Sequence, residues 1–178
     1  MEDKKFLYKG FHSIEQLDAI IKGEPKVIEK LGLKSAVAAI VTDAEGKTAF
    51  VKQYRPCVDA ICYEMPAGLM DKDGLTSKEI LTEELWEECE IDPADIVYFS
   101  DEPIHSYYMV CSSSDAKMSL YRVKLRSIQH SKAIGDEDVD SVEWLTPEEF
   151  EQLARRGEIK DPETLIAYLY MRQAKKSV

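Results

Sequence analysis

The sequence predicts an α/β (α+β) fold in which helices pack on a mixed β-sheet. Strand-like segments predominate first, one acidic helix interrupts them, and helical patterns close the chain. The 178 residues are 44% hydrophobic and 32% charged, which is typical of a globular domain. No linker is long enough to separate two domains. We therefore expect residues 35–178 to form one compact unit, preceded by an N-terminal strand and helix region at residues 1–34.

The elements of the first half follow from local patterns. The segment "KKFLYKG" can form a first strand, and "SIEQLDAII", at residues 13–21, has the rhythm of a short helix. The stretch "KSAVAAIVTDAEGKTAFVKQYRP", at residues 34–56, predicts two strands around the turn "DAEGK". A further short strand in "DAICYEMPAG" ends at Pro66 and Gly68.

The best helical pattern of the first half is "TSKEILTEELWEECE". β structure resumes in "DPADIVYFSDEP", continues as two strands around a polar loop in "HSYYMVCSSSDAKMSLYRVKL", and ends with "SVEWL". Thr146 and Pro147 start a helix that ends at Gly157, and Asp161 and Pro162 start another.

The charge balance excludes several function classes. The net charge of −11 and the isoelectric point of about 4.8 argue against non-specific binding to nucleic acid or to an anionic membrane. No run of about 18 apolar residues predicts a transmembrane helix, and the start "MEDKKFLYKG" does not resemble a secretory signal.

The four cysteines show neither paired zinc spacing nor a dense disulfide pattern. We interpret them as reduced, buried thiols of a cytoplasmic protein. They are Cys57, Cys62, Cys89 and Cys111.

The acidic helix has two distinct faces at 3.6 residues per turn. Leu81, Leu85 and Cys89 fall on one stripe, with Trp86 beside it, and this stripe is the expected core face.

A second stripe of the same helix carries Glu84, Glu87 and Glu88. Three carboxylates within one turn suit a hard cation such as Mg²⁺, which needs only one or two of them together with waters and substrate phosphates. A solvated charged face is the alternative. The preceding "YEMPAGLMD" favours the metal site, because a strand that ends in Pro-Ala-Gly and leads through a loop to this helix is a specific arrangement.

The stretch "EMPAG" and the continuation "GLMDKDGLTSKEILTEELWEECEI" resemble the signature of the Nudix hydrolases, G-x5-E-x7-R-E-U-x-E-E-x-G-U, where U is aliphatic. The matching residues are Gly68, Glu84, Leu85, Glu87, Glu88 and Ile91. The resemblance implies a Nudix-type α/β/α sandwich with a mixed sheet and an additional N-terminal antiparallel sheet region.

The signature also departs from the consensus. The stretch before the helix core is one residue longer, and Gly74 or Leu75 stands where an early Glu is usual. Glu83 replaces an Arg that braces this segment in the family, and Glu90 replaces a helix-ending glycine. We therefore expect different bracing and a different helix end.

The strand "VKQYRP" resembles one that is typical of enzymes hydrolysing ADP-ribose and nucleotide sugars, and the loop "GLMDKDGLTSKE" resembles the UDP-glucose pyrophosphatase type. This resemblance implies that Arg55 binds substrate phosphates, for which its planar fork is suited. It also implies that Glu64 lies near the metals. Tyr54, Tyr107 or Tyr108 could stack on a base or sugar, although a place in the aromatic core is the alternative.

A second acidic cluster occurs in "GDEDVDSVEWL". It is not an EF-hand, because Ser141 and Pro147 stand where glycine and glutamate are needed. In the resembled branch, a loop before the last strand carries the general base. The prediction is Glu137, with Asp136 and Asp138 as rivals and a solvated turn as the alternative.

The implied activity is hydrolysis of a nucleoside diphosphate sugar to nucleoside monophosphate and sugar phosphate, with Mg²⁺ or Mn²⁺. The substrate would be ADP-ribose or a nucleotide sugar such as UDP-glucose or GDP-mannose. The metal ligands would be Glu84, Glu87, Glu88 and the Ala67 carbonyl, and the catalytic residues Glu137 and Glu87.

The resemblance also implies a homodimer formed through the N-terminal strands, with no nucleic-acid or membrane partner. The alternative function is a non-catalytic nucleotide-binding sensor or interaction module. Glu83 and Glu90 motivate this alternative, because they add negative charge beside the metal site.

Overall fold

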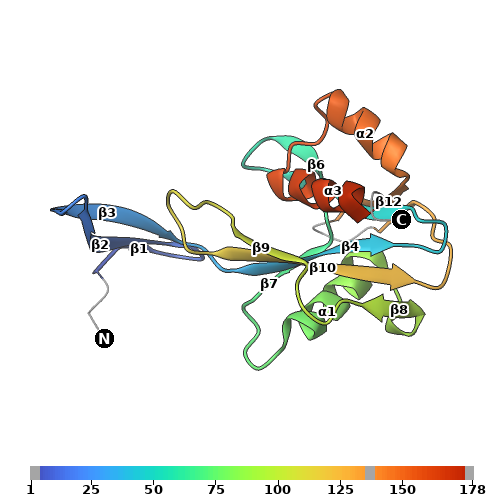
Figure 1. Ribbon diagram of the computed structural model, residues 1–178, viewed down its shortest axis with the longest axis horizontal. Coiled ribbons are helices and arrows are strands. Elements are labelled where there is room, and N and C mark those ends of the chain that lie inside the picture. Colours follow the sequence, from blue (N-terminus) through green and yellow to red (C-terminus); the bar gives the residue numbers. More distant parts are fainter. Residues whose placement is uncertain (1–4, 135–138, 175–178) are drawn as a thin grey trace.

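The computed structural model describes residues 5–134 and 139–174. Within these residues the strands form one three-stranded sheet and one nine-stranded sheet. Figure 1 shows the smaller sheet projecting as an arm from a body that holds the larger sheet and the helices. The prediction of a mixed sheet with helices and an additional N-terminal antiparallel sheet is confirmed.

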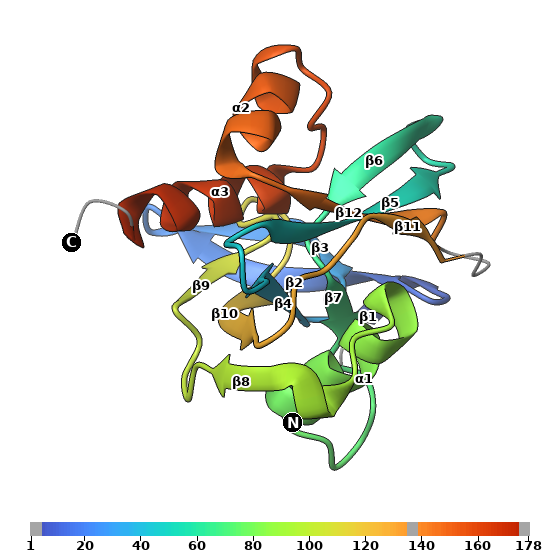
Figure 2. The same ribbon diagram turned by 90° about the vertical axis from the view of Figure 1, so that its right-hand side faces the viewer.

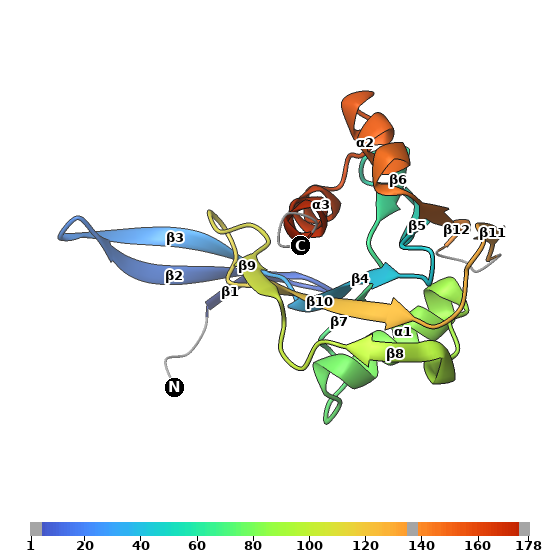
Figure 3. The same cartoon turned by 45° about the vertical axis from the view of Figure 1, so that its right-hand side comes forward.

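The arm is an antiparallel meander of β1 (Lys5–Lys9), β2 (Ser13–Ile21) and β3 (Glu24–Gly32). The predicted helix at residues 13–21 is therefore wrong, because this segment is β2. Lys22 and Gly23, with φ of 53° and 85°, close a two-residue turn of the kind that matches strand twist. Pairing along all of β3 then outweighs the weak helical rhythm. The hairpin extends well beyond the body (Figure 3).

The large sheet is built around β4 (Ala36–Thr42), which is buried along almost its whole length. The predicted hairpin with β5 (Thr48–Arg55) is confirmed, and β10 (Lys117–Leu125) runs parallel to β4 on its other side. The strand predicted from "SVEWL" is β12 (Ser141–Leu145), antiparallel to β5. The remaining strands are β6 (Ala60–Glu64), β7 (Ala67–Leu69), β8 (Ile96–Phe99), β9 (His105–Tyr108) and β11 (Lys132–Ala133).

Helices cover both faces of this sheet (Figure 2). One face carries α1 (Ser77–Cys89), and the other carries α2 (Pro147–Arg155) and α3 (Pro162–Ala174). A short 3₁₀ turn (Pro93–Asp95) precedes β8. Because side chains alternate along a strand, β4 contributes to both cores: Val37, Ala39 and Val41 pack with α1, and Ala36, Ala38 and Ile40 pack with α2 and α3. This layering is the expected α/β/α sandwich.

Two details of the predicted core are wrong. We expected Trp86 beside the core face of α1, but 56% of its surface is exposed. Ile80 is buried in its place, together with the predicted core residues Leu81, Leu85 and Cys89. Cys62 and Cys89 are buried as expected, whereas the other two cysteines, Cys57 and Cys111, are exposed; all four are free thiols.

Within the described part of the chain, no helix has the length and apolar character needed to cross a membrane.

Candidate functional site

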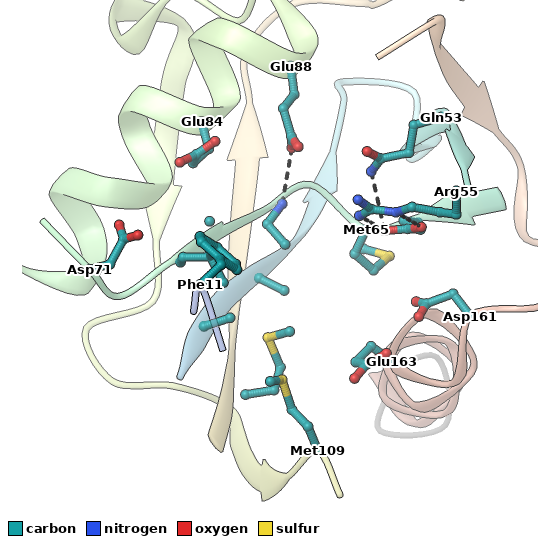
Figure 4. A pocket seen from close by; sticks show the side chains of 17 residues that line it. Phe11, Gln53, Arg55, Met65, Asp71, Glu84, Glu88, Met109, Asp161 and Glu163 are labelled. Atoms are coloured by element: carbon teal, nitrogen blue, oxygen red, sulfur yellow. Dashed lines mark hydrogen bonds and ion pairs between the residues drawn. The ribbon is translucent and has the colours of Figure 1, made fainter. Parts of the chain in front are cut away.

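A cavity of about 730 Å³ opens between α1, the β5–β6 hairpin and the start of α3. Its lining includes two glutamates of α1, Glu84 and Glu88, and the side chains of Arg55 and Glu64 on the opposite wall. Figure 4 shows Glu84, Glu88 and Arg55 pointing into the same space. The cavity thus combines a region rich in carboxylates with a guanidinium, which is a suitable arrangement for an anionic ligand accompanied by a cation.

The start of α1 is fixed by a capping box. The Thr76 hydroxyl accepts a hydrogen bond from the Glu79 backbone N–H at 3.3 Å, and the Glu79 carboxylate accepts one from the Thr76 N–H at 2.8 Å. Because the helix must begin here, Glu84 and Glu88 follow two and three turns later on one face. The capping box, a signal local to the sequence, therefore determines which turns of the helix carry the two glutamates.

The helix ends at Glu90, which adopts the left-handed conformation with φ of 53°. The Glu90 N–H bonds the Trp86 carbonyl at 2.9 Å, and the Ile91 N–H bonds the Leu85 carbonyl at 3.0 Å. These two bonds form the cap that glycine usually provides. Our expectation of a different helix end is wrong, because Glu90 takes the glycine conformation in spite of its side chain.

The loop before α1 is braced by an ion pair between Lys72 and Glu83, with Nζ and Oε2 separated by 2.8 Å. Leu75, which stands near the missing consensus Glu, packs against the hydrophobic core instead. The Lys72 ammonium also lies 4.0 Å from the Glu84 carboxylate. The loop is therefore braced differently from the consensus. The carboxylate of its ion pair, Glu83, lies on the helix at the position where the consensus has an arginine.

Strand β7 lies directly against the two α1 carboxylates. A Cβ on Gly68 would lie 2.5 Å from Glu84 Cγ and 2.7 Å from its Oε1, so that only glycine leaves space for this side chain. The Ala67 N–H donates to Glu88 Oε2 at 3.1 Å. The sequence Ala67–Gly68 is therefore the surface on which Glu84 and Glu88 are positioned.

Burial raises the pKa of both carboxyl groups. The pKa of Glu88 rises to about 8, chiefly because of burial and in spite of the hydrogen bond from Ala67. Burial also raises the pKa of Glu84, against the opposing effect of Lys72. Their ionised forms are therefore costly unless a cation approaches, as expected of metal ligands.

Other predicted site residues lie apart from this group. Glu87 is exposed on α1 and does not line the cavity. Tyr54 also lies outside it, because strand alternation directs Gln53 and Arg55 to the cavity and Tyr54 to the other face. Its hydroxyl donates to Asp59 Oδ1 at 2.6 Å.

The predicted general base, Glu137, and its rivals Asp136 and Asp138 lie outside the described residues.

Sequence reasoning missed two acidic residues at the start of α3. Asp161 caps the helix by accepting from the Thr164 N–H at 2.7 Å, and Glu163 points into the cavity beside it (Figure 4). Burial and the neighbouring Asp161 raise the pKa of Glu163 to about 8. The helix start was predicted from Asp161 and Pro162, but no sequence pattern indicates that this helix end faces the cavity.

Phe11 was missed as well, and it brings the N-terminal arm to the mouth of the cavity. The ring is 68% exposed, and the Lys34 ammonium lies 4.9 Å from its centre. Lys34 also pairs with Asp71 at 2.7 Å, which connects the arm to the loop before α1. An aromatic ring among charges at a cavity entrance gives no periodic signal in the sequence.

The donor set fits a hard cation, since the cavity lining offers carboxylate oxygens. In the stretches 5–134 and 139–174, however, no three His, Cys, Asp or Glu side chains are grouped closely enough to hold a metal by themselves. Mg²⁺ commonly uses one or two carboxylates and completes its shell with water and phosphate oxygens. Glu84 and Glu88 are compatible with that mode.

Comparison with known proteins identifies the family. A model of the NUDIX domain matches residues 32–168. The chain belongs to the NUDIX family.

This NUDIX protein is also similar to the "Methanol dehydrogenase activator" of Bacillus methanolicus. The two are 35% identical over 153 residues, which cover 79% of this chain and 75% of the relative. Membership of the NUDIX family supports hydrolysis of nucleoside diphosphate derivatives, for which the family typically uses divalent cations.

Proposed function

We propose that the protein hydrolyses the diphosphate bond of a nucleoside diphosphate sugar and releases a nucleoside monophosphate and a sugar phosphate. The substrate class is ADP-ribose or a nucleotide sugar such as UDP-glucose or GDP-mannose. One observation carries the proposal: Arg55 and the paired glutamates Glu84 and Glu88 line the same cavity. A diphosphate bridging them would meet a phosphate-binding fork on one side and a metal site on the other.

Mg²⁺, or Mn²⁺ in its place, would be held by Glu84, Glu87, Glu88 and the Ala67 carbonyl. When bound, the cation neutralises diphosphate charge, polarises phosphorus and orients water. The cavity supports a requirement for cations. Its lining carries acidic side chains from α1, from the β5–β6 hairpin and from the start of α3, and a single arginine. Without cations such a lining would repel the substrate.

The chain's own groups would divide the remaining tasks. Arg55 holds a phosphate through its guanidinium N–H groups. Glu137, or Asp136 or Asp138, takes the proton of the attacking water. Phe11 offers an exposed ring for stacking on a base, a role in which it is better placed than Tyr54.

The N-terminal arm supports assembly as a homodimer. Its strands carry exposed apolar side chains in an unusual number for a solvated sheet. These are Phe6, Leu7, Tyr8, Ile20, Ile21, Val27 and Ile28. A second copy would cover them, and analytical ultracentrifugation of the wild type and of an Ile20→Lys, Val27→Lys variant tests this. A monomeric wild type would contradict the proposal.

A second candidate is regulation of another enzyme, with or without turnover. It is favoured by the similarity to a protein named as an activator of methanol dehydrogenase. In a purely regulatory module, the NUDIX cavity would bind a nucleotide as a signal. Stimulation of a methanol dehydrogenase by a variant that has no hydrolase activity would favour the regulatory function.

The deciding experiment measures nucleoside monophosphate release from ADP-ribose, UDP-glucose, GDP-mannose and nucleoside triphosphates, with and without Mg²⁺. We expect cation-dependent cleavage of at least one diphosphate sugar, and a much lower rate of cleavage in Glu88→Gln. Glu151→Gln on α2, which does not line the cavity, serves as a matched control. Binding of a nucleotide without cleavage of any substrate would move the conclusion to the sensor or regulatory function.

A further inference from the structure

Arg55 is bound to Glu64 through two parallel hydrogen bonds. Arg55 Nε donates to Glu64 Oε1 at 2.8 Å, and Nη2 donates to Oε2 at 2.6 Å. This fork-to-fork geometry is the strongest form of the arginine–carboxylate pair and fixes the plane of the guanidinium. Only 16% of the Glu64 side chain is exposed, compared with 49% for Arg55.

The register of the β5–β6 hairpin produces this pair. Gln53 and Arg55 lie on the same face because they are two residues apart. Arg55 is opposite Ala60, and Gln53 is opposite Cys62. These small cross-strand partners leave space for the long arginine side chain to fold back along β6 and reach Glu64.

Gln53 completes the environment of Glu64. Its side-chain amide donates to Glu64 Oε2 at 3.2 Å, and Gln53 itself is buried. An ionised carboxylate has about four acceptor positions, and three on Glu64 are taken by donors from β5. Such a carboxylate has little capacity left to coordinate a cation.

Arg55 retains donors for a ligand. A guanidinium has about five N–H groups, and two of them point at Glu64. The others remain on the edge that Figure 4 shows turned toward the interior of the cavity and Glu88. A side chain already held in its binding geometry loses less conformational freedom when a phosphate arrives.

We propose that Glu64, supported by Gln53, is a positioning residue that holds the Arg55 guanidinium ready for a substrate phosphate, and that it is not a metal ligand. This rests on the proposed function, since it assumes that Arg55 binds a diphosphate. It revises the role implied for Glu64 by the sequence, in which this residue lies near the metals.

A double-mutant cycle with Glu64→Ala and Arg55→Ala tests the proposal, using the diphosphate sugar that the wild type cleaves fastest. Arg55→Ala removes a charged hydrogen-bonding group and should raise KM by about 10- to 100-fold. Glu64→Ala should raise KM by about 3- to 10-fold and change kcat little. If Glu64 acts through Arg55, the double variant should be no worse than Arg55→Ala alone.

The Mg²⁺ concentration for half-maximal rate separates positioning from metal binding. It should stay at the wild-type value in Glu64→Ala and in the milder Glu64→Gln, and should rise in Glu88→Gln. Glu151→Gln is the matched control, since Glu151 also pairs with an arginine but does not line the cavity: its Oε1 accepts from both Nε and Nη2 of Arg155 on α2, at 3.1 and 2.5 Å. Melting temperatures establish that each variant is folded.

Two results would overturn the proposal: additive effects of the two substitutions, or a rise in the Mg²⁺ requirement of Glu64→Gln similar to that of Glu88→Gln. Absence of turnover of every diphosphate sugar by the wild type would instead remove the proposed function, and the role of Glu64 with it.

Discussion

Gly68 and Glu84 are in such close contact that a methyl group on Gly68 would come within 2.5 Å of the Glu84 side chain. The strand before α1 thus supports the helix and also determines where one proposed metal ligand lies. The backbone of Gly68 itself is not in the left-handed region. Glycine is needed here for space, and not for conformation.

We predict that Gly68→Ala displaces the Glu84 carboxylate. Because Glu84 is flexible, the free energy of unfolding should fall by only about 1–2 kcal/mol. Turnover should fall by about 100-fold, since small displacements of a reacting site are costly. Urea denaturation and kcat/KM measure the two effects.

The control is the same substitution in a Glu84→Ala background, where the clash is absent and the loss of stability should disappear. A Gly68→Ala protein with normal turnover would show that Glu84 is not needed where the structure has it.

Glu88 gives a prediction for the dependence of stability on pH. Its carboxyl group has a pKa of about 8 in the folded, cation-free protein and an ordinary value of 4.5. Between these values the unfolded chain has lost the proton and the folded chain has kept it, so that the free energy of unfolding falls as pH rises. Glu88→Gln removes this dependence and should be more stable than the wild type at pH 8 by about 1–3 kcal/mol.

Urea denaturation in EDTA at pH 5 and pH 8 measures this difference, which should be small at pH 5. Glu87→Gln, which changes an exposed carboxylate on the same helix, should leave both values unaltered. Equal pH profiles for Glu88→Gln and the wild type would contradict the raised pKa.

Local signals were sufficient to predict much of the fold. The β4–β5 hairpin and the starts of the three helices were predicted correctly, because turns and caps act within a few residues. Strand β2 was predicted incorrectly because its identity depends on β3 and on the turn at Lys22 and Gly23. A weak pattern over nine residues does not reveal such a partner.

The candidate site was predicted in part for the same reason. Glu84 and Glu88 belong to one helix, and their shared face follows from periodicity. The approach of Glu163 and Phe11 to the same cavity depends on how the end of α3 and the N-terminal arm pack, which no spacing in the chain encodes. The roles of Glu87, Tyr54 and Glu137 stay predictions.

Glu87 is the sharpest test of the metal assignment, because it is exposed and outside the cavity lining. If it binds the cation, Glu87→Gln should lower turnover by about 100-fold or more, since a metal contributes several kcal/mol to the transition state. Its melting temperature without cation should equal that of the wild type. Glu90→Gln is the control. Turnover of Glu87→Gln at the wild-type level would restrict the metal site to Glu84, Glu88 and backbone oxygens.

The helix cap at Glu90 gives a prediction of increased stability. Its left-handed conformation costs a residue with a Cβ about 1 kcal/mol that glycine does not lose. Glu90→Gly also removes an exposed ion pair with Lys132 at 2.7 Å, which is worth less than about 1 kcal/mol. The free energy of unfolding should therefore rise by about 0.5 kcal/mol.

Glu90→Ala separates the two effects, because it keeps the strained backbone and loses the ion pair, and it should be no more stable than the wild type. A Glu90→Gly protein less stable than Glu90→Ala in urea denaturation would show that the side chain of Glu90, rather than its backbone, governs the end of this helix.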